Sequence, residues 1–73
     1  MENRVAELRK TQAWSQAELA ERLGVSRQTI ISIERGRFDP SLPLAFRIAH
    51  VFGCRIEDVF VPDLSEIAPA QVQ

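Results

Sequence analysis

The sequence has few of the residues that stabilise secreted or metal-dependent small proteins. It contains one cysteine, Cys54, in 73 residues. A single cysteine cannot form an internal disulfide, and it cannot assemble a structural zinc site, which needs four ligands. The first five residues carry mixed charge and lack the apolar stretch of a secretory signal. These absences lead us to expect a cytoplasmic protein, located at the nucleoid if it binds DNA, without a metal or other cofactor.

Long hydrophobic runs are also absent. No apolar run exceeds three residues, as at 44–46 and 59–61, whereas a membrane-spanning helix needs about 20. No membrane association is therefore expected. Hydrophobic residues still make up 45% of the chain, enough for one small core and too many for a disordered polymer. The length predicts a single domain.

What the sequence does contain is a series of helix signals. Ser15, Ser26 and Ser41 each precede an amphipathic stretch and are expected to cap a helix. With Glu18, Ser15 forms a predicted capping box of two reciprocal bonds. Asn3 is expected to cap the first helix. The predicted helices span residues 3–13, 16–23, 27–35, 42–52 and 56–60, and glycines at 24, 36 and 53 end the second, third and fourth.

The charge is unevenly distributed. The net charge of −1 conceals +3 over residues 1–55 and −4 over residues 56–73. Within 22–37, four arginines stand against Glu34 alone. A polyanion responds to the local patch rather than to the total, so the first part of the chain remains a candidate for nucleic-acid binding.

The most informative segment is 16–35, which combines two short helices with a tight turn. Ala20 is small enough to let the helices cross closely, and Gly24 allows the chain to reverse. The helix that begins at Arg27 points polar side chains outward, including Arg27 and Gln28. Arginine and glutamine can make paired hydrogen bonds to base edges in the major groove. The alternative is an ordinary solvated helix face.

At these residues the sequence resembles the Cro and phage-repressor type of helix-turn-helix regulators. The resemblance covers about residues 4–60 and is carried by residues 8–9, 15–30, 33–38, 40–42, 44–49 and 52–60. It implies an all-α, compact five-helix domain of the lambda-repressor type over residues 1–60. Residues 61–73 are then a C-terminal extension, expected to be partly flexible or associated with a dimer.

The resemblance also implies roles for individual residues. Base edges are expected to be contacted by Arg27, Gln28, Ile31 and Ser32, and phosphates by Gln16, Ser26, Thr29, Arg35 and Arg37. Arg9 and Glu34 are expected to form a partly buried structural salt bridge. Helix N-termini at Gln16 and Arg27 independently favour phosphate, because their backbone N–H groups lack partners.

Four residues depart from the common family pattern. Ala13 stands where glycine is frequent, and Trp14 where an aliphatic residue is usual. Trp14 is expected to pack at the first loop rather than to stack on a base. Arg55 replaces a serine or threonine cap, so the fifth helix is expected to be less well capped. Ile31 occupies an outward position that is often serine. It could touch a thymine methyl, pack on a neighbour, or simply be exposed.

The resemblance implies a homodimer, since one such helix reads only about four base pairs. A two-fold dimer reads half-sites about 34 Å apart. The candidate interface comprises Phe46, Phe52, Ile56, Phe60 and Val61, which exceed what a small core needs. An antiparallel strand pair formed by residues 1–3 and 60–62 is expected there.

The resulting prediction is a sequence-specific, double-stranded-DNA-binding repressor of bacterial or phage-like type that acts as a homodimer on a palindromic operator. An antitoxin-like module that masks another protein is the alternative, supported by the acidic segment 61–73. An enzyme is not expected, because no nucleophile–base pair, phosphate-binding glycine loop or metal cluster is evident. The remaining candidates are interpreted without a function: Lys10 and Arg47 as a solvated face, His50 as a structural or exposed side chain, and Cys54 as an inert thiol.

Overall fold

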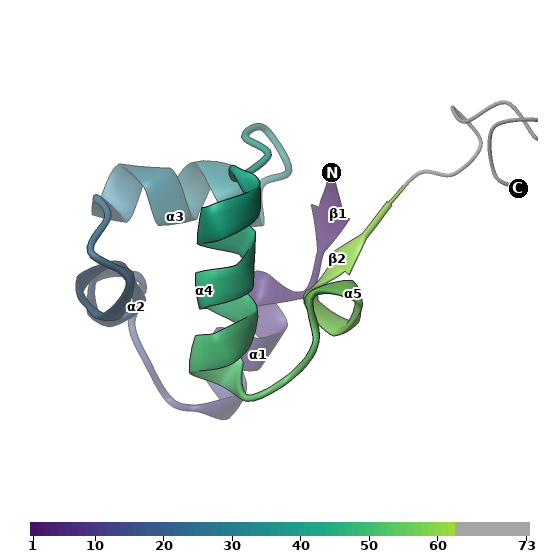
Figure 1. Ribbon diagram of the computed structural model, residues 1–73. Helices are drawn as coiled ribbons and strands as arrows, with labels where there is room; N and C mark the ends of the chain where they lie inside the picture. Colours follow the sequence, from purple (N-terminus) through teal and green to yellow (C-terminus); the bar gives the residue numbers. More distant parts are fainter. Residues whose placement is uncertain (63–73) are drawn as a thin grey trace, which may run out of the picture.

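The computed structural model describes residues 1–62 as a helical domain closed by a small sheet. Its elements are, in order, β1 (Glu2–Asn3), α1 (Val5–Thr11), α2 (Gln16–Leu23), α3 (Arg27–Glu34), α4 (Leu42–Phe52), α5 (Ile56–Val59) and β2 (Phe60–Val61). In Figure 1, α3 lies along the upper edge, α4 crosses the centre, and the two strands lie on the far side of α4 from α2. The expected five-helix architecture with a terminal strand pair is confirmed.

Serine caps start the three longest helices where the sequence predicts them. The Oγ atoms of Ser15, Ser26 and Ser41 accept bonds from backbone N–H groups three residues later, at 3.0, 3.1 and 3.3 Å. The second half of the predicted capping box is wrong, however. The Glu18 carboxylate lies 3.8 Å from Arg22 Nη2 instead of bonding the Ser15 backbone, because the next turn of α2 offers it a cation.

The fifth helix is capped by Asp58, a residue within the helix, rather than by the side chain of the residue that precedes it. The Asp58 carboxylate accepts a hydrogen bond from the backbone N–H of Arg55 at 3.0 Å. This bond lowers the pKa of Asp58 below its ordinary value of 3.8, and burial acts against that shift. Asp58 thus satisfies an N-terminal N–H group despite the missing serine or threonine.

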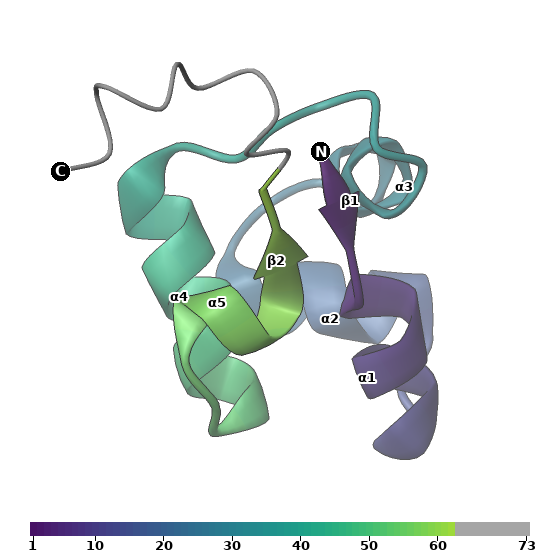
Figure 2. The same cartoon turned by 90° about the vertical axis from the view of Figure 1, so that its right-hand side faces the viewer.

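The first helix is shorter than predicted, since it covers Val5–Thr11 rather than 3–13. Asn3 belongs to β1, which pairs with β2 in antiparallel fashion, Glu2 opposite Val61 and Asn3 opposite Phe60. Asn3 nevertheless accepts the Val5 N–H through Oδ1 at 3.1 Å, so it caps α1 from outside the helix. Figure 2 shows the two strands side by side, with β1 beginning next to one end of α3 and running from there to α1.

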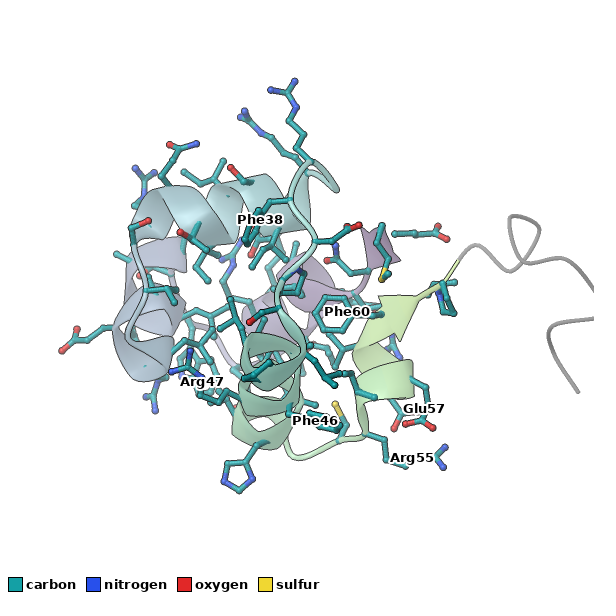
Figure 3. All side chains as sticks on the ribbon, turned by 45° about the horizontal axis from the view of Figure 1, so that its top comes forward. Phe38, Phe46, Arg47, Arg55, Glu57 and Phe60 are labelled. Carbon is teal, nitrogen blue, oxygen red and sulfur yellow. The ribbon has the colours of Figure 1, made fainter. Side chains whose placement is uncertain are left out.

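A single core joins all five helices to the sheet. Its buried members are Val5, Leu19, Ala20, Leu23, Ile30, Ile33, Leu44, Ala45, Ile48, Ala49, Val59 and Phe60. Phe60 is only 6% exposed, and Figure 3 shows its side chain directed into the molecule. Its expected availability for a dimer interface is therefore wrong, because the strand pair turns it inward. The predicted extension 61–73 lies outside the described residues beyond position 62.

Candidate nucleic-acid interface

The helix–turn–helix segment is built by the residues that the sequence identified. Gly24 adopts φ +72°, a left-handed conformation in which a Cβ is strained. The turn then closes with a hydrogen bond from Val25 N to the Ala20 carbonyl at 3.0 Å. Ala20 is buried, so α2 and α3 approach each other without a large side chain between them. The turn fixes α3 across α2 at the edge of the molecule (Figure 1).

One side of α3 is anchored in the core and the other is open. Ile30 and Ile33 are fully buried, whereas Arg27 and Gln28 are exposed and Ser32 is half-buried. Ile31 is also half-buried rather than fully outward. We call Arg27, Gln28, Ile31, Ser32 and Arg35 the α3 face. The structure thus brings together the residues that were predicted to contact base edges.

The N-terminal end of α3 has the properties of an anion site. Ser26 Oγ accepts the Thr29 N–H at 3.1 Å and lies 2.8 Å from Thr29 Oγ1, with one hydroxyl donating to the other. The backbone N–H groups of Arg27 and Gln28 belong to the first turn, where a helix provides no carbonyl partner. Positive partial charge therefore collects at this end, and a phosphate oxygen is a suitable acceptor.

The other end of α3 carries two more cations. Gly36, at φ +72°, turns the chain immediately after the helix, so that Arg35 and Arg37 flank the turn and both are exposed. Backbone bonds hold the turn, from Gly36 N to the Ile33 carbonyl at 2.9 Å and from Arg37 N to the Ser32 carbonyl at 3.0 Å. Cations at both ends of one exposed helix match the two backbones that border a major groove.

The predicted salt bridge between Arg9 and Glu34 is present and largely shielded from water. Arg9 Nε and Nη2 donate to the two carboxylate oxygens of Glu34 at 2.7 and 3.3 Å, and the side chains are 12% and 8% exposed. Arg9 Nη1 also donates to the Trp14 carbonyl at 2.9 Å. The pair joins α1, the α1–α2 turn and α3.

This arrangement has an electrostatic consequence for the α3 face. Glu34 is the only acidic residue of α3, and its charge is compensated inside by Arg9. The outward surface is therefore left with Arg27, Arg35 and Arg37. Asp39, in the following loop, is paired with the Met1 ammonium group at 2.9 Å. The local field is more positive than the sequence count suggests.

Gln16 has a role that sequence reasoning missed. Its Nε2 donates to Glu34 Oε1 at 3.1 Å, so this predicted phosphate contact also belongs to the buried network. Arg47, interpreted from sequence as a solvated residue, donates through Nη1 to the Leu23 carbonyl at 3.0 Å. It thereby satisfies the last carbonyl of α2, and Figure 3 shows it reaching from α4 toward α2. Both contacts join segments distant in sequence, which local patterns do not reveal.

Trp14 packs within the protein, as expected from sequence. Its ring stacks on Phe52 with centroids 5.8 Å apart, and the Arg22 guanidinium lies 4.1 Å from the ring centroid. These contacts tie the α1–α2 turn to α2 and to the end of α4. Phe52, a predicted interface residue, is therefore half-buried within the monomer and has less surface to offer a partner.

Several apolar side chains of α4, α5 and the two ends of the described chain are exposed or half-buried. Phe46 is 55% exposed and Val61 is 42% exposed, as the dimer prediction requires, while Ile56 is half-buried. Sequence reasoning missed Leu42 and Met1, which are also exposed. Met1, Leu42 and Ile56 line one concavity of about 240 Å³ beside Phe60. We call Met1, Leu42, Phe46, Ile56 and Val61 the apolar surface.

The remaining candidate groups have ordinary environments. Cys54 is half-buried, and burial raises the pKa of its thiol, which disfavours the reactive thiolate. His50 is exposed on α4. Within residues 1–62 there is no group of three metal-ligating side chains. None of the helices in this range has the length and apolar character to cross a bilayer.

Comparison with known proteins identifies the family to which this geometry belongs. A helix-turn-helix family model matches residues 5–59. The sequence is 54% identical over 61 residues to an HTH-type transcriptional regulator of Methanocaldococcus jannaschii, covering 84% of this chain and 92% of the relative. It is 48% identical over 60 residues to YgzD, an HTH-type transcriptional regulator of Bacillus subtilis, covering 82% and 91% of the two chains.

Solved structures agree with this result. A transcription factor from Neisseria superposes with a TM-score of 0.71 at 25% identity, covering 86% of this chain and 72% of the other. A chain of the SinR–SinI protein complex gives 0.72 at 25% identity, covering 93% and 67%. The chain belongs to the helix-turn-helix family of Cro and phage-repressor type, whose members are DNA-binding transcriptional regulators.

Proposed function

We propose that the protein is a sequence-specific repressor that binds a palindromic double-stranded operator as a homodimer. The observation that supports this most directly is the α3 face, which is open, anchored from behind by Ile30 and Ile33, and bordered by cations at both ends. A helix presented in this way fits the major groove. A dimer seated on a promoter would exclude the transcription machinery.

The proposed roles follow the position of each side chain along α3. Arg27, Gln28, Ile31 and Ser32 read base edges, because they project from the first two turns. The phosphates are contacted by Gln16, Ser26, Thr29, Arg35 and Arg37. Gln16 keeps an amide oxygen and one N–H for that purpose while its other N–H holds Glu34. Phosphate contacts set the register, and base contacts set the sequence.

The proposed dimer uses the apolar surface. It is formed by α4, α5 and the strand pair, whereas the DNA-reading residues come from α3 (Figure 1). A two-fold axis through this surface leaves both α3 helices free, and it requires half-sites about one helical turn apart. Phe60 contributes by fixing β2 from the inside rather than by contact with the partner.

In-vitro selection from random duplexes tests the main proposal. The expected winner is a palindrome whose half-site centres are about 34 Å apart, or about 10 base pairs. Enrichment of a single asymmetric site would exclude the two-fold dimer. Failure to enrich any sequence above the starting pool would exclude sequence-specific binding.

Two arginine variants test the division of roles on the selected duplex. Arg27→Ala should relax base preference and weaken binding by about 1–3 kcal/mol per half-site. Arg37→Ala should weaken binding to all duplexes alike and reduce the slope of log K against log salt by about 1. Arg55→Ala is the matched control, since it removes one charge on the side of the domain away from α3 (Figure 3). If both test variants lose affinity equally for all duplexes, the assigned roles are wrong.

Phe46→Ser tests the dimer surface. Because Phe46 is 55% exposed, the substitution should leave the monomer fold intact and raise the dimer dissociation constant at least tenfold in sedimentation equilibrium. Phe38→Ser, at a residue that is 46% exposed in the loop after α3, is the control and should change dimerisation little. An unchanged Phe46→Ser dimer would place the interface elsewhere.

A further inference from the structure

The N-terminal strand makes a contact with the end of α3 that the proposed function does not use. Asn3 Nδ2 donates to the Ile33 carbonyl at 2.8 Å and to the Met1 carbonyl at 3.2 Å. Its Oδ1 accepts the Val5 N–H at 3.1 Å. The Asn3 backbone meanwhile pairs with that of Phe60. One half-buried amide therefore links the core, the start of α1 and the last turn of α3.

The carbonyl that Asn3 binds belongs to the turn that presents the arginines. Ile33 O also accepts the Gly36 N–H at 2.9 Å. Its two lone pairs are thus shared between the turn and the N-terminal strand. The turn is closed on the other side by Met1, whose ammonium nitrogen lies 3.3 Å from the Gly36 carbonyl. A Cβ added at Gly36 would lie 3.4 Å from the Met1 carbonyl oxygen.

We infer that Asn3 is a positioning residue for DNA binding, which fixes the turn that carries Arg35 and Arg37 before the protein meets DNA. This inference rests on the proposed function, because it concerns the phosphate contacts assigned to those arginines. The physical reason is preorganisation. A turn held in place by Asn3 binds phosphate without first losing conformational freedom, whereas a loose turn must be ordered at that moment. Asn3 itself bonds only to protein atoms, so it acts through the turn.

Two substitutions separate the functions of this amide. Asn3→Asp keeps the oxygen that accepts the Val5 N–H and removes both donations, including the bond to Ile33. Asn3→Ala removes all three bonds. Glu2→Gln is the control, since Glu2 is an exposed neighbour in the same strand whose side chain makes no hydrogen bond or ion pair within residues 1–62. Affinity tags belong at the C-terminus so that the Met1 amine stays unmodified.

The first measurement uses the free protein. Hydrogen exchange should become about fivefold faster at the Gly36 and Arg37 amides in Asn3→Asp, the equilibrium ratio expected for one hydrogen bond. The Val25 amide, in the turn between α2 and α3, should exchange at its original rate, and Glu2→Gln should alter none of them. Unchanged exchange at Gly36 and Arg37 in both Asn3 variants would overturn the inference.

The second measurement is a double-mutant cycle on the selected duplex. Asn3→Asp alone should weaken binding about fivefold, and Arg37→Ala should then weaken it less than in the original protein. Gln28 lies at the opposite end of α3, so Gln28→Ala should reduce the affinity for the duplex by the same factor in the original protein and in Asn3→Asp. A general loss of stability would not produce this selective coupling. Full additivity with Arg37→Ala would overturn the inference.

The two proposals fail in different ways. If the original protein binds no selected duplex, the proposed function is wrong, while hydrogen exchange in the free protein still decides whether Asn3 holds the turn. If the original protein binds and the exchange is unaffected by the Asn3 variants, the DNA-binding proposal stands and the positioning role is wrong.

Discussion

Ala13 is the one residue other than glycine in the described chain with a positive φ, at +59°. It follows α1, where the Ala13 and Trp14 N–H groups bond back to the carbonyls of Lys10 and Arg9 at 3.0 and 3.1 Å. This is the hydrogen-bond pattern of a helix end that normally contains glycine at its left-handed position. We predict that Ala13→Gly stabilises the protein.

Two opposing effects set the magnitude. A left-handed backbone costs an L-residue with a Cβ about 1–2 kcal/mol, which glycine avoids. Glycine also gives the unfolded chain more freedom, which opposes folding by about 0.4–1 kcal/mol. Ala13 is exposed, so no packing is lost with its methyl group. The net gain should be about 0.5–1 kcal/mol, with Tm higher by about 2–8 °C for a domain of this size.

The measurement is urea unfolding followed by the fluorescence of Trp14, the single tryptophan. Protein concentration must be equal across samples, because any dimer makes the apparent stability depend on it. Ala17→Gly is the matched control. The same chemical change at an exposed position in α2 should destabilise by about 0.5–1 kcal/mol. Equal destabilisation by both variants would show that the Ala13 backbone is not strained.

Two further predictions concern ionic groups. Arg9→Ala should destabilise the protein by about 3–5 kcal/mol, because it leaves the buried Glu34 carboxylate without its cation. The double variant Arg9→Met with Glu34→Leu should have a free energy of unfolding within about 2 kcal/mol of the original protein. If urea unfolding shows the same loss of stability for both variants, the cost does not come from an unpaired buried charge. The lowered pKa of Asp58 means that its contribution is present above pH 3.8 and is lost as the pH falls through the lower folded-state pKa. Asp58→Asn should therefore reduce the fall in Tm between pH 4 and pH 2. If Tm falls equally in the variant and the original protein, protonation of Asp58 does not contribute to the acid sensitivity.

Local signals predicted most of the helical framework. The observed bounds of α2 and α4 are those expected from Ser15, Ser41 and the glycines that follow each helix. A side-chain cap and a left-handed glycine act within a few residues, so the sequence alone is sufficient to place them. The packing role of Trp14 was also predictable, because a large aromatic ring beside a helix start is usually buried.

The errors arose where distant segments meet. The first helix was predicted to begin at Asn3, but the pairing of Asn3 with Phe60 keeps this residue in a strand, as the alternative prediction for residues 1–3 had it, and the helix begins at Val5. Phe60 was assigned to an interface because the core seemed complete without it, yet the same pairing turns it inward. Gln16 and Arg47 bond to groups 18 and 24 residues away. Such contacts depend on tertiary structure, which outweighs local preference.

The pairing of Glu2 with Val61 also bears on how the molecule is assembled during synthesis. The backbone hydrogen bonds within helices α1 to α4 join residues that are close in sequence. The first strand, in contrast, must wait for its partner, because Val61 is translated 59 residues after Glu2. A nascent polypeptide that has not yet exposed residue 61 therefore lacks the strand pair that joins the N-terminal residues to the rest of the domain. The sheet, and with it the complete fold, can form only after β2 has been synthesised.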